Sequence, residues 1–323
     1  MRRSGRVSSG RRPGRSTLSC NPILKKWRRR RRPAYMEMTM NFTQEVSAWL
    51  SENGYGELES SQSVGGGCIN QTLEIHTSHK ERFFLKYHGS PPVGMFSVEA
   101  RSLDILREAK GVRVPVVIAN AEHYLLLEWV EPHERAPDYW TRFGEGLAKQ
   151  HQSVALEFGF GFATYCGTTL QPNDNYTDGY VFFAQQRLLF QGQLAYDSGK
   201  LDSGAMWRLE ALCRKLPELV PQQPPSLLHG DLWSGNAHQD ENGAPVLIDP
   251  ACYYGWREAE LGMTMLFGGF GEEFYAAYDA AYPLEEGWRD RVDIYNLYHL
   301  LNHLNLFGGG YSGQVQRILG AYT

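Results

Sequence analysis

The stretch LLHGDLWSGN, residues 227–236, constrains what this chain can fold into more than any other part of its sequence. It places the Asp231 carboxylate shortly before the Asn236 amide, and a second carboxylate, Asp249, follows in the apolar run VLIDP. The DENG turn between Asn236 and Asp249 suits a hairpin that brings Asp249 back close to Asp231 and Asn236. Carboxylate and amide oxygens bind hard cations, and a carboxylate can accept a hydroxyl proton. The spacing predicts a cation site beside an acceptor hydroxyl; an ordinary surface loop is the alternative.

The hydrophobic pattern changes near residue 130. Before that point, strand patterns cover 63–77 with a glycine turn, 82–88, 114–120 and 123–130, and helical patterns cover 41–54 and 96–111. After it, helical patterns cover 138–152, 179–195, 203–216, 258–268, 271–281 and 288–306, with one short strand at 245–249. We therefore predict an α+β fold of two lobes, β-rich over 39–130 and mainly helical over 131–323, with a hinge near 128–132.

Two features of the β-rich part suit a bound phosphate chain. Gly65, Gly66 and Gly67 join two strand-like runs, and glycines let backbone N–H groups approach phosphates closely. Lys86 lies in the apolar strand FFLKY, where a lysine needs a negative partner, and Glu99 on the next helix is a natural one. A plain hairpin turn and an edge-strand charge remain the alternatives. A glycine turn, strand lysine, helix glutamate and Asp-x4-Asn follow the order found in kinases.

These stretches together resemble the fructosamine kinase (ketosamine kinase) family, within the kinase-like group that includes aminoglycoside and choline phosphotransferases. The resemblance covers about residues 40–323 and rests on GGGCINQT, FFLK, LLLEW, GTTLQPN, HGDLWSGN and IDPACYYG. It implies a bilobal protein-kinase-like fold and the ATP- and Mg²⁺-dependent phosphorylation of a ketosamine hydroxyl, the 3-hydroxyl of fructosamine or ribulosamine. The product sheds its sugar, so the implied activity is a deglycating repair.

The resemblance also implies a role for each candidate residue. Asp231 is the catalytic base, Asn236 and Asp249 are the Mg²⁺ ligands, Lys86 held by Glu99 binds phosphate, Gly65–Gly67 cover the triphosphate, and backbone groups of Glu128, Trp129 and Val130 hold adenine. Trp233 is interpreted as a substrate contact, with a lobe-packing aromatic as the alternative. His229 and His151 are interpreted as structural.

The sequence departs from the family pattern at two positions. Trp256 stands where members often carry His, and Glu260 where Asp is common. Glu260 is expected to brace the catalytic loop from a helix start, and its longer side chain makes that role less secure. Two other functions stay open: a kinase for another alcohol, such as an aminoglycoside or choline-like compound, and a catalytically silent kinase fold. The second of these is disfavoured because the chain retains the expected kinase residues Lys86, Asp231, Asn236 and Asp249.

Charge and cysteine usage bear on location and partners. Residues 1–35 are rich in Arg and Lys without any acidic residue, so the rest of the chain is strongly acidic although the formal net charge is −4. We interpret residues 1–38 as a basic, disordered extension, with a nucleic-acid arm or a transit segment as alternatives; nucleic acid is not expected elsewhere. No apolar run is long enough to span a membrane.

The cysteines are few and scattered. The chain has five, without a CxxC pair, which favours a reducing compartment and a cytoplasmic location. Cys68 lies in the glycine turn, where its oxidation would block ATP binding if its thiol is reactive; a small turn residue is the alternative. The sequence predicts no oligomeric state.

Overall fold

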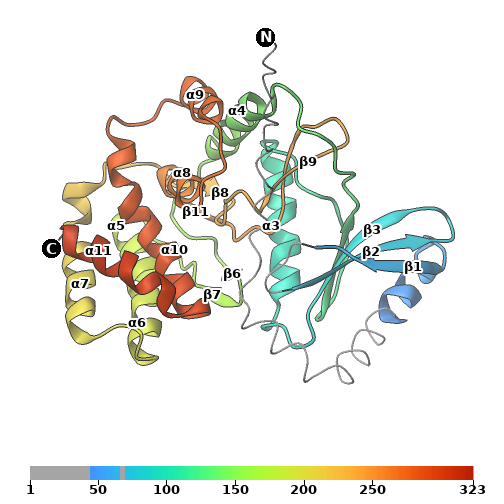
Figure 1. Ribbon diagram of the computed structural model, residues 1–323, viewed down its shortest axis with the longest axis horizontal. Helices are drawn as coiled ribbons and strands as arrows, with labels where there is room; N and C mark the ends of the chain where they lie inside the picture. The colour runs from blue at the N-terminus through green and yellow to red at the C-terminus, as the bar shows by residue number, and fades with distance from the viewer. Residues whose placement is uncertain (1–43, 66–69, 323) are drawn as a thin grey trace, which may run out of the picture.

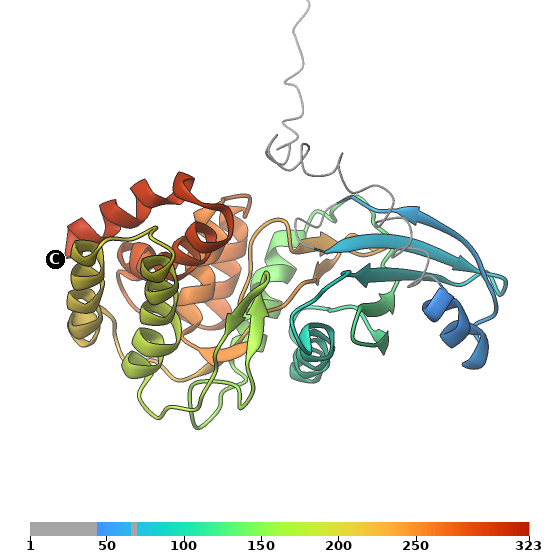
Figure 2. The ribbon, with the colours of Figure 1, turned by 90° about the horizontal axis from the view of Figure 1, so that it is seen from below.

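The computed structural model describes residues 44–65 and 70–322 of the chain. The basic extension and the expectations attached to Gly66, Gly67 and Cys68 lie outside the described residues. Within them, the fold is α+β and bilobal, with the sheet in one half of the molecule and most of the helices in the other (Figures 1 and 2).

The first half is built on one antiparallel sheet of five strands in the order β1-β2-β3-β5-β4. Its elements are β1 (Leu58–Ser63), β2 (Gln71–Thr77), β3 (Arg82–Tyr87), α3 (Met95–Ala109), β4 (Val117–Asn120) and β5 (Tyr124–Glu128), after a helical segment over 44–52. Lys86 of β3 is directly opposite Thr72 of β2 and Leu125 of β5. The register therefore fixes the lysine in the middle of the sheet.

Strand β5 shows how the sheet separates two cores. Successive side chains of a strand point to opposite faces. Leu126 packs with Val46 and Leu50 of the segment 44–52. Leu125 and Leu127 instead join a second core with Phe96 and other residues of α3. That second core continues into the helical half through Leu147 and Leu232, so the two lobes share packed side chains.

The second half consists of helices and short two-stranded sheets. Its elements are α4 (Tyr139–His151), β6 (Thr164–Cys166), β7 (Thr169–Gln171), α5 (Gly179–Phe182), the π-helix η1 (Phe183–Leu189), α6 (Phe190–Asp197), α7 (Ser203–Leu219), β8 (Ser226–Leu228), β9 (Ala237–Gln239), β10 (Pro245–Leu247), β11 (Tyr253–Gly255), α8 (Arg257–Leu266), α9 (Glu272–Ala281), the 3-10 helix η2 (Trp288–Arg291), α10 (Val292–Phe307), the 3-10 helix η3 (Gly309–Tyr311) and α11 (Ser312–Tyr322). Strands β8 and β11 lie in the middle of the molecule, between α3 and the outer helices (Figure 1).

The sequence located most of these elements, but not all of them. Strand β1 ends at Ser63, where the expected strand pattern of 63–77 begins, and α11 was not predicted. The helix expected over 179–195 is α5, a π-helical turn and α6 in succession, and the helix expected over 288–306 begins as a 3-10 turn before α10. Apart from a strand at 245–249, the three-residue strands of the second half were not anticipated, because three residues are too few to show a period. None of the helices in the described ranges is both long and apolar enough to cross a bilayer.

Candidate active site

The segment 229–231, the predicted catalytic loop, follows β8 and is held by its backbone. Gly230 has a φ of +85°, and a Cβ added there would lie 1.9 Å from the Ala251 carbonyl oxygen, so only glycine fits. Glu260 of α8 accepts hydrogen bonds from the backbone N–H groups of Gly230 at 2.6 Å and His229 at 2.9 Å. The segment before Asp231 is therefore fixed against both α8 and the chain that follows Asp249.

Glu260 is itself held from the other side. His151 of α4 lies 2.9 Å from its carboxylate and 2.8 Å from the Tyr278 hydroxyl. Burial raises the pKa of Glu260, but the hydrogen bonds from His151 and Gly230 outweigh it and leave the pKa below its ordinary value of 4.5. Glu260 thus makes the bracing contact despite its extra methylene group. His229 Nε2 contacts the Ile248 carbonyl oxygen at 2.9 Å, as a structural histidine would.

Asp231 and Asn236 lie side by side. The Asn236 Nδ2 donates to the Asp231 carbonyl oxygen at 2.9 Å and to its carboxylate at 3.3 Å. Within the described residues the Asn236 Oδ1 accepts no hydrogen bond, so this oxygen is available to a cation. Burial, with the nearby Asp249 carboxylate as the next cause, raises the pKa of Asp231 to about 7. A carboxyl group with such a pKa suits proton transfer near neutral pH.

Asp249 connects this loop to the sheet. Its φ of +57° is unusual for a residue other than glycine, and such conformations are often found at functional sites. The Lys86 Nζ lies 2.9 Å from the Asp249 Oδ1 and 2.8 Å from both Glu99 carboxylate oxygens. Burial lowers the pKa of Lys86, but the two carboxylates outweigh it and hold the pKa above its ordinary value. The lysine is therefore a buried cation between the two lobes.

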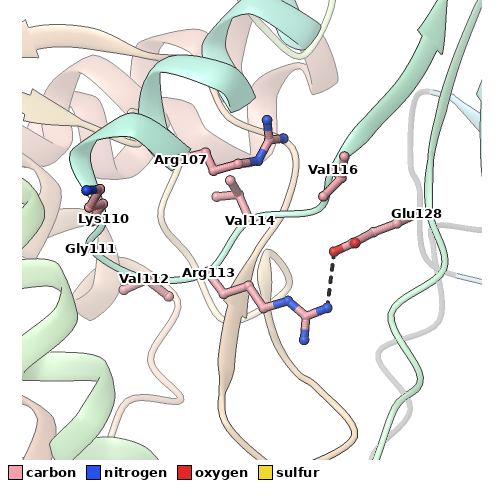
Figure 3. Close-up of a pocket in the computed structure, with 8 residues that line it drawn as sticks. All are labelled: Arg107, Lys110, Gly111, Val112, Arg113, Val114, Val116 and Glu128. Carbon is pink, nitrogen blue, oxygen red and sulfur yellow. Dashed lines mark hydrogen bonds and ion pairs between the residues drawn. The ribbon is translucent and has the colours of Figure 1, made fainter.

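In the predicted hinge, the side chains of Glu128 and Trp129 contact other side chains of the protein. The Glu128 carboxylate pairs with Arg113 at 3.2 Å and lines a cavity of about 340 Å³ (Figure 3). The Trp129 Nε1 donates to Glu131, and the Arg82 guanidinium lies 4.7 Å from the Trp129 ring centroid. The Glu128 N–H donates to the Val116 carbonyl, so this backbone donor is already paired.

The remaining predicted residues fall in different places. Gly65 is an exposed residue in a bend two positions after the end of β1. Trp233 packs over Gly235, where a Cβ would lie 2.2 Å from the indole, and its ring meets Phe267 edge-on with centroids 6.1 Å apart. Trp233 is only half-buried, so part of the indole faces solvent near Asp231. Trp256, in contrast, is buried in an aromatic core with Phe183 and other rings.

Sequence reasoning missed a buried polar layer beneath the loop. Arg187 is fully buried and donates to the Pro172 carbonyl at 2.7 Å and the Asn173 Oδ1 at 2.6 Å. The Gln171 Nε2 donates to the Ala251 carbonyl at 2.8 Å, two residues beyond Asp249. The signal was the quoted stretch GTTLQPN, which contains Gln171 and Asn173, but nothing in it indicated Arg187 as the partner.

Comparisons with known proteins show the family of this chain. The fructosamine kinase family model matches residues 42–323. A probable ketoamine kinase of Enterococcus faecium is 42% identical over 263 residues, covering 79% of this chain and 92% of the relative. The chloroplastic protein-ribulosamine 3-kinase of Arabidopsis thaliana is 36% identical over 301 residues, covering 90% of this chain and 91% of the relative.

Solved structures show the same fold. A protein of Thermobifida fusca assigned as a fructosamine-3-kinase superposes with a TM-score of 0.79 at 32% identity, covering 86% of this chain and 98% of that chain. Aminoglycoside phosphotransferases also superpose, and their low sequence identity makes them a guide to the fold alone.

Proposed function

This chain belongs to the fructosamine kinase family, and from that premise we propose that it transfers the γ-phosphoryl group of ATP to a ketosamine hydroxyl, the 3-hydroxyl of fructosamine or ribulosamine. The observation that carries the proposal is the Lys86 Nζ, held by Glu99 and Asp249 across the two lobes with Asp231 on the adjoining loop. A buried lysine between a helix glutamate and a second aspartate is the phosphate-holding arrangement of kinases.

Asp231 is the catalytic base in this proposal. Its carboxylate orients the acceptor hydroxyl and accepts its proton as the phosphoryl group moves in line, with no covalent enzyme intermediate. Glu260 and Gly230 act on this step only by fixing the loop. Their backbone contacts keep the carboxylate in place while the acceptor approaches from the solvent side, where half-buried Trp233 offers a flat face for the sugar or its amine.

The donor set also suits Mg²⁺. Asn236 offers its free Oδ1, and Asp249 offers the carboxylate oxygen that Lys86 does not contact; both are the hard oxygen ligands that this ion prefers. These two residues would hold the ion, which when bound supplies positive charge to the phosphate oxygens. Lys86 adds a second positive charge. Gly65–Gly67 and backbone groups of Glu128, Trp129 and Val130 remain the proposed contacts for the triphosphate and adenine.

The test is ATP consumption by the full chain with fructoselysine and ribuloselysine as acceptors, with the phosphorylated position located by NMR. We expect turnover with at least one of the two and phosphate on the 3-oxygen. An aminoglycoside and choline serve as control acceptors. Phosphorylation of a control acceptor but of neither ketosamine would contradict the proposal and favour a kinase for another alcohol.

The role of Asp231 has its own prediction. Asp231→Asn keeps the size of the side chain but removes the proton acceptor, so we expect kcat to fall by at least about a hundredfold while ATP binding is largely retained. Turnover is measured with the better ketosamine, and ATP binding by calorimetry on the same preparation. Full activity in Asp231→Asn would remove this residue from the role.

The place where the reaction occurs also belongs to the proposal. A cytoplasmic location remains the expectation from the cysteine pattern, and the plant relative named above is chloroplastic. A fluorescent fusion of the full chain, compared with one lacking residues 1–38, would show whether the basic segment directs transport. Retention of both fusions in the cytoplasm is the expected result.

A further inference from the structure

Three side chains with metal-binding atoms gather beneath the catalytic loop, apart from Asn236 and Asp249. Cys166 ends β6, His299 lies in the middle of α10, and Asp231 follows β8. One thiol sulfur, one imidazole nitrogen and one carboxylate oxygen all lie within 4.8 Å of one another. Cys166 and His299 are buried, at 3% and 4% exposure, and Asp231 is open on one side. The cluster thus has two ligands in the interior and one at the mouth.

A second observation concerns the imidazole of this cluster. The Nδ1 of His299 is buried and has no hydrogen-bond partner among residues 44–65 and 70–322. Buried polar groups in folded proteins are nearly always paired, so an unpaired imidazole nitrogen requires an explanation. The neighbouring His303 does not supply one, because its ring contacts the His299 carbonyl oxygen rather than the His299 ring. A bound cation at the cluster would give the imidazole a partner.

We propose that Cys166, His299 and Asp231 form a binding site for a zinc-type divalent cation. Three protein ligands with sulfur, nitrogen and oxygen donors and one open position are typical of zinc sites with an exchangeable fourth ligand. The thiolate and imidazole select Zn²⁺ or Co²⁺ over Mg²⁺, which prefers oxygen ligands. Ligand atoms in a tetrahedral zinc site lie about 3.5 Å apart, so the side chains need to approach by roughly 1 Å.

Binding releases the proton of the Cys166 thiol, and an Asp231 carboxyl group that is protonated loses its proton as well. The Cys166 thiol becomes a thiolate as the metal–sulfur bond forms, and its proton passes to solvent. The charges around the cluster are mixed: Asp249 and Glu260 add negative charge near Asp231, whereas Lys86 and Arg187 add positive charge. The thiolate and the Asp231 carboxylate together neutralise the ion, so the site does not depend on the outer charges.

The expected consequence of occupancy rests on the proposed function. A zinc ion held by Asp231 takes the carboxylate that accepts the acceptor's proton, so Zn²⁺ should inhibit even at saturating Mg²⁺ and ATP. Because Cys166 and His299 have no assigned part in phosphoryl transfer, Cys166→Ser should keep its basal activity while becoming less sensitive to Zn²⁺. Loss of a direct ligand should weaken inhibition by more than the roughly 10- to 100-fold that loss of a supporting group typically costs.

A binding test that does not depend on kinase turnover is a titration of the full chain with Co²⁺, because thiolate complexes of Co²⁺ have a charge-transfer absorption band. We expect this band in the wild-type chain, its loss in Cys166→Ser and in His299→Gln, and its retention in Cys213→Ser, a matched change of a partly buried cysteine on α7. A wild-type chain without the band, or a band that survives Cys166→Ser or His299→Gln, would overturn the site. Circular dichroism verifies that each variant folds.

A second measurement needs no variant. X-ray absorption of the wild-type chain loaded with one equivalent of Zn²⁺ should show one sulfur neighbour at about 2.3 Å beside nitrogen and oxygen neighbours; a shell of oxygen and nitrogen alone contradicts the site. The spectra and the kinase assay also separate the two proposals. Cobalt binding without ketosamine turnover would support the metal site and contradict the proposed function. Ketosamine turnover without cobalt binding would support the proposed function and contradict the metal site.

Discussion

At the scale of single residues, Glu260 shows how one carboxylate can organise a loop it does not belong to. It accepts two backbone N–H groups immediately before Asp231 and pairs with His151 behind them. Glu260 and His151 are both buried, so none of these hydrogen bonds is easily replaced by water. The position of the proposed catalytic carboxylate, Asp231, therefore depends on a residue whose own side chain does not contact it.

Glu260→Gln tests this dependence through pH. Because the folded-state pKa of Glu260 is below its ordinary value of 4.5, its charge contributes stability that is present above pH 4.5 and is lost as pH falls through the lower folded-state pKa. Gln keeps an acceptor oxygen but does not titrate. We expect Glu260→Gln to be less stable at pH 7 by about 1–3 kcal/mol, and to lose less stability than the wild type on acidification below pH 4.5.

The measurement is chemical unfolding at pH 7 and at pH 4, with Glu272→Gln on the exposed start of α9 as the control. A wild-type chain and a Glu260→Gln variant with the same acid dependence would show that Glu260 contributes nothing through its charge. The kinase assay on the same samples should show a larger loss in kcat than in the KM for ATP.

At the scale of elements, the helix that contains the π-turn holds an unusual cation. Arg187 lies in η1, and its guanidinium is 3.9 Å from the Tyr253 ring centroid on β11. It donates to Pro172 and Asn173 and has no carboxylate partner among the described residues. Since π-turns are often found at functional sites, the extra residue in this helix turn is consistent with the placement of Arg187 under the loop.

We predict that Arg187→Met destabilises the protein by about 2–4 kcal/mol. The change leaves the Pro172 carbonyl and the Asn173 side chain without their donor in a buried place. Arg214→Met, on the exposed face of α7, is the matched control and should change stability by less than about 0.5 kcal/mol. Denaturant unfolding of both variants measures the difference. Equal stability of the two variants would show that water replaces the guanidinium.

The sequence predicted some contacts between elements and missed others. Lys86 in an apolar strand and Glu99 on the following helix were predicted as partners because a buried lysine needs a negative charge, and they lie 2.8 Å apart. The contact of Lys86 with Asp249 depends on how the lobes pack, which no local pattern contains. Arg187, Cys166 and His299 were missed for the same reason: their neighbours come from distant elements. The boundaries at residues 38 and 130 stay predictions.

At the scale of the whole molecule, two charged groups join the lobes, one buried and one partly exposed. Lys86 contacts Asp249 in the interior. On the outside, Arg113 contacts Glu128 at 3.2 Å, Asp240 at 3.1 Å and Glu241 at 3.2 Å, and its carbonyl accepts the Leu247 N–H. The outer group therefore connects the end of β5 to the β9–β10 hairpin that precedes Asp249.

Arg113→Ala should loosen this connection without touching the site. Pairs that are partly exposed contribute about 0.2–1 kcal/mol each, so the stability loss is small. The KM for ATP should rise about two- to fivefold, because closure of the lobes on the nucleotide becomes less favourable by about that free energy. Steady-state kinetics measure it, with Arg317→Ala, which breaks the remote pair with Asp293, as the control. An unchanged KM in Arg113→Ala would contradict a role of this pair in closure.

The backbone contact at Gly230 has a consequence for how this kind of protein can diversify. The Ala251 carbonyl lies where a Cβ of residue 230 would be, so the backbone next to Asp231 contacts the backbone near Asp249 directly. The spacing of Asp231 and Asp249 is thus independent of the side chains that surround the acceptor. New acceptors can be accommodated by exchanging residues around Trp233, while the geometry of transfer is inherited unchanged.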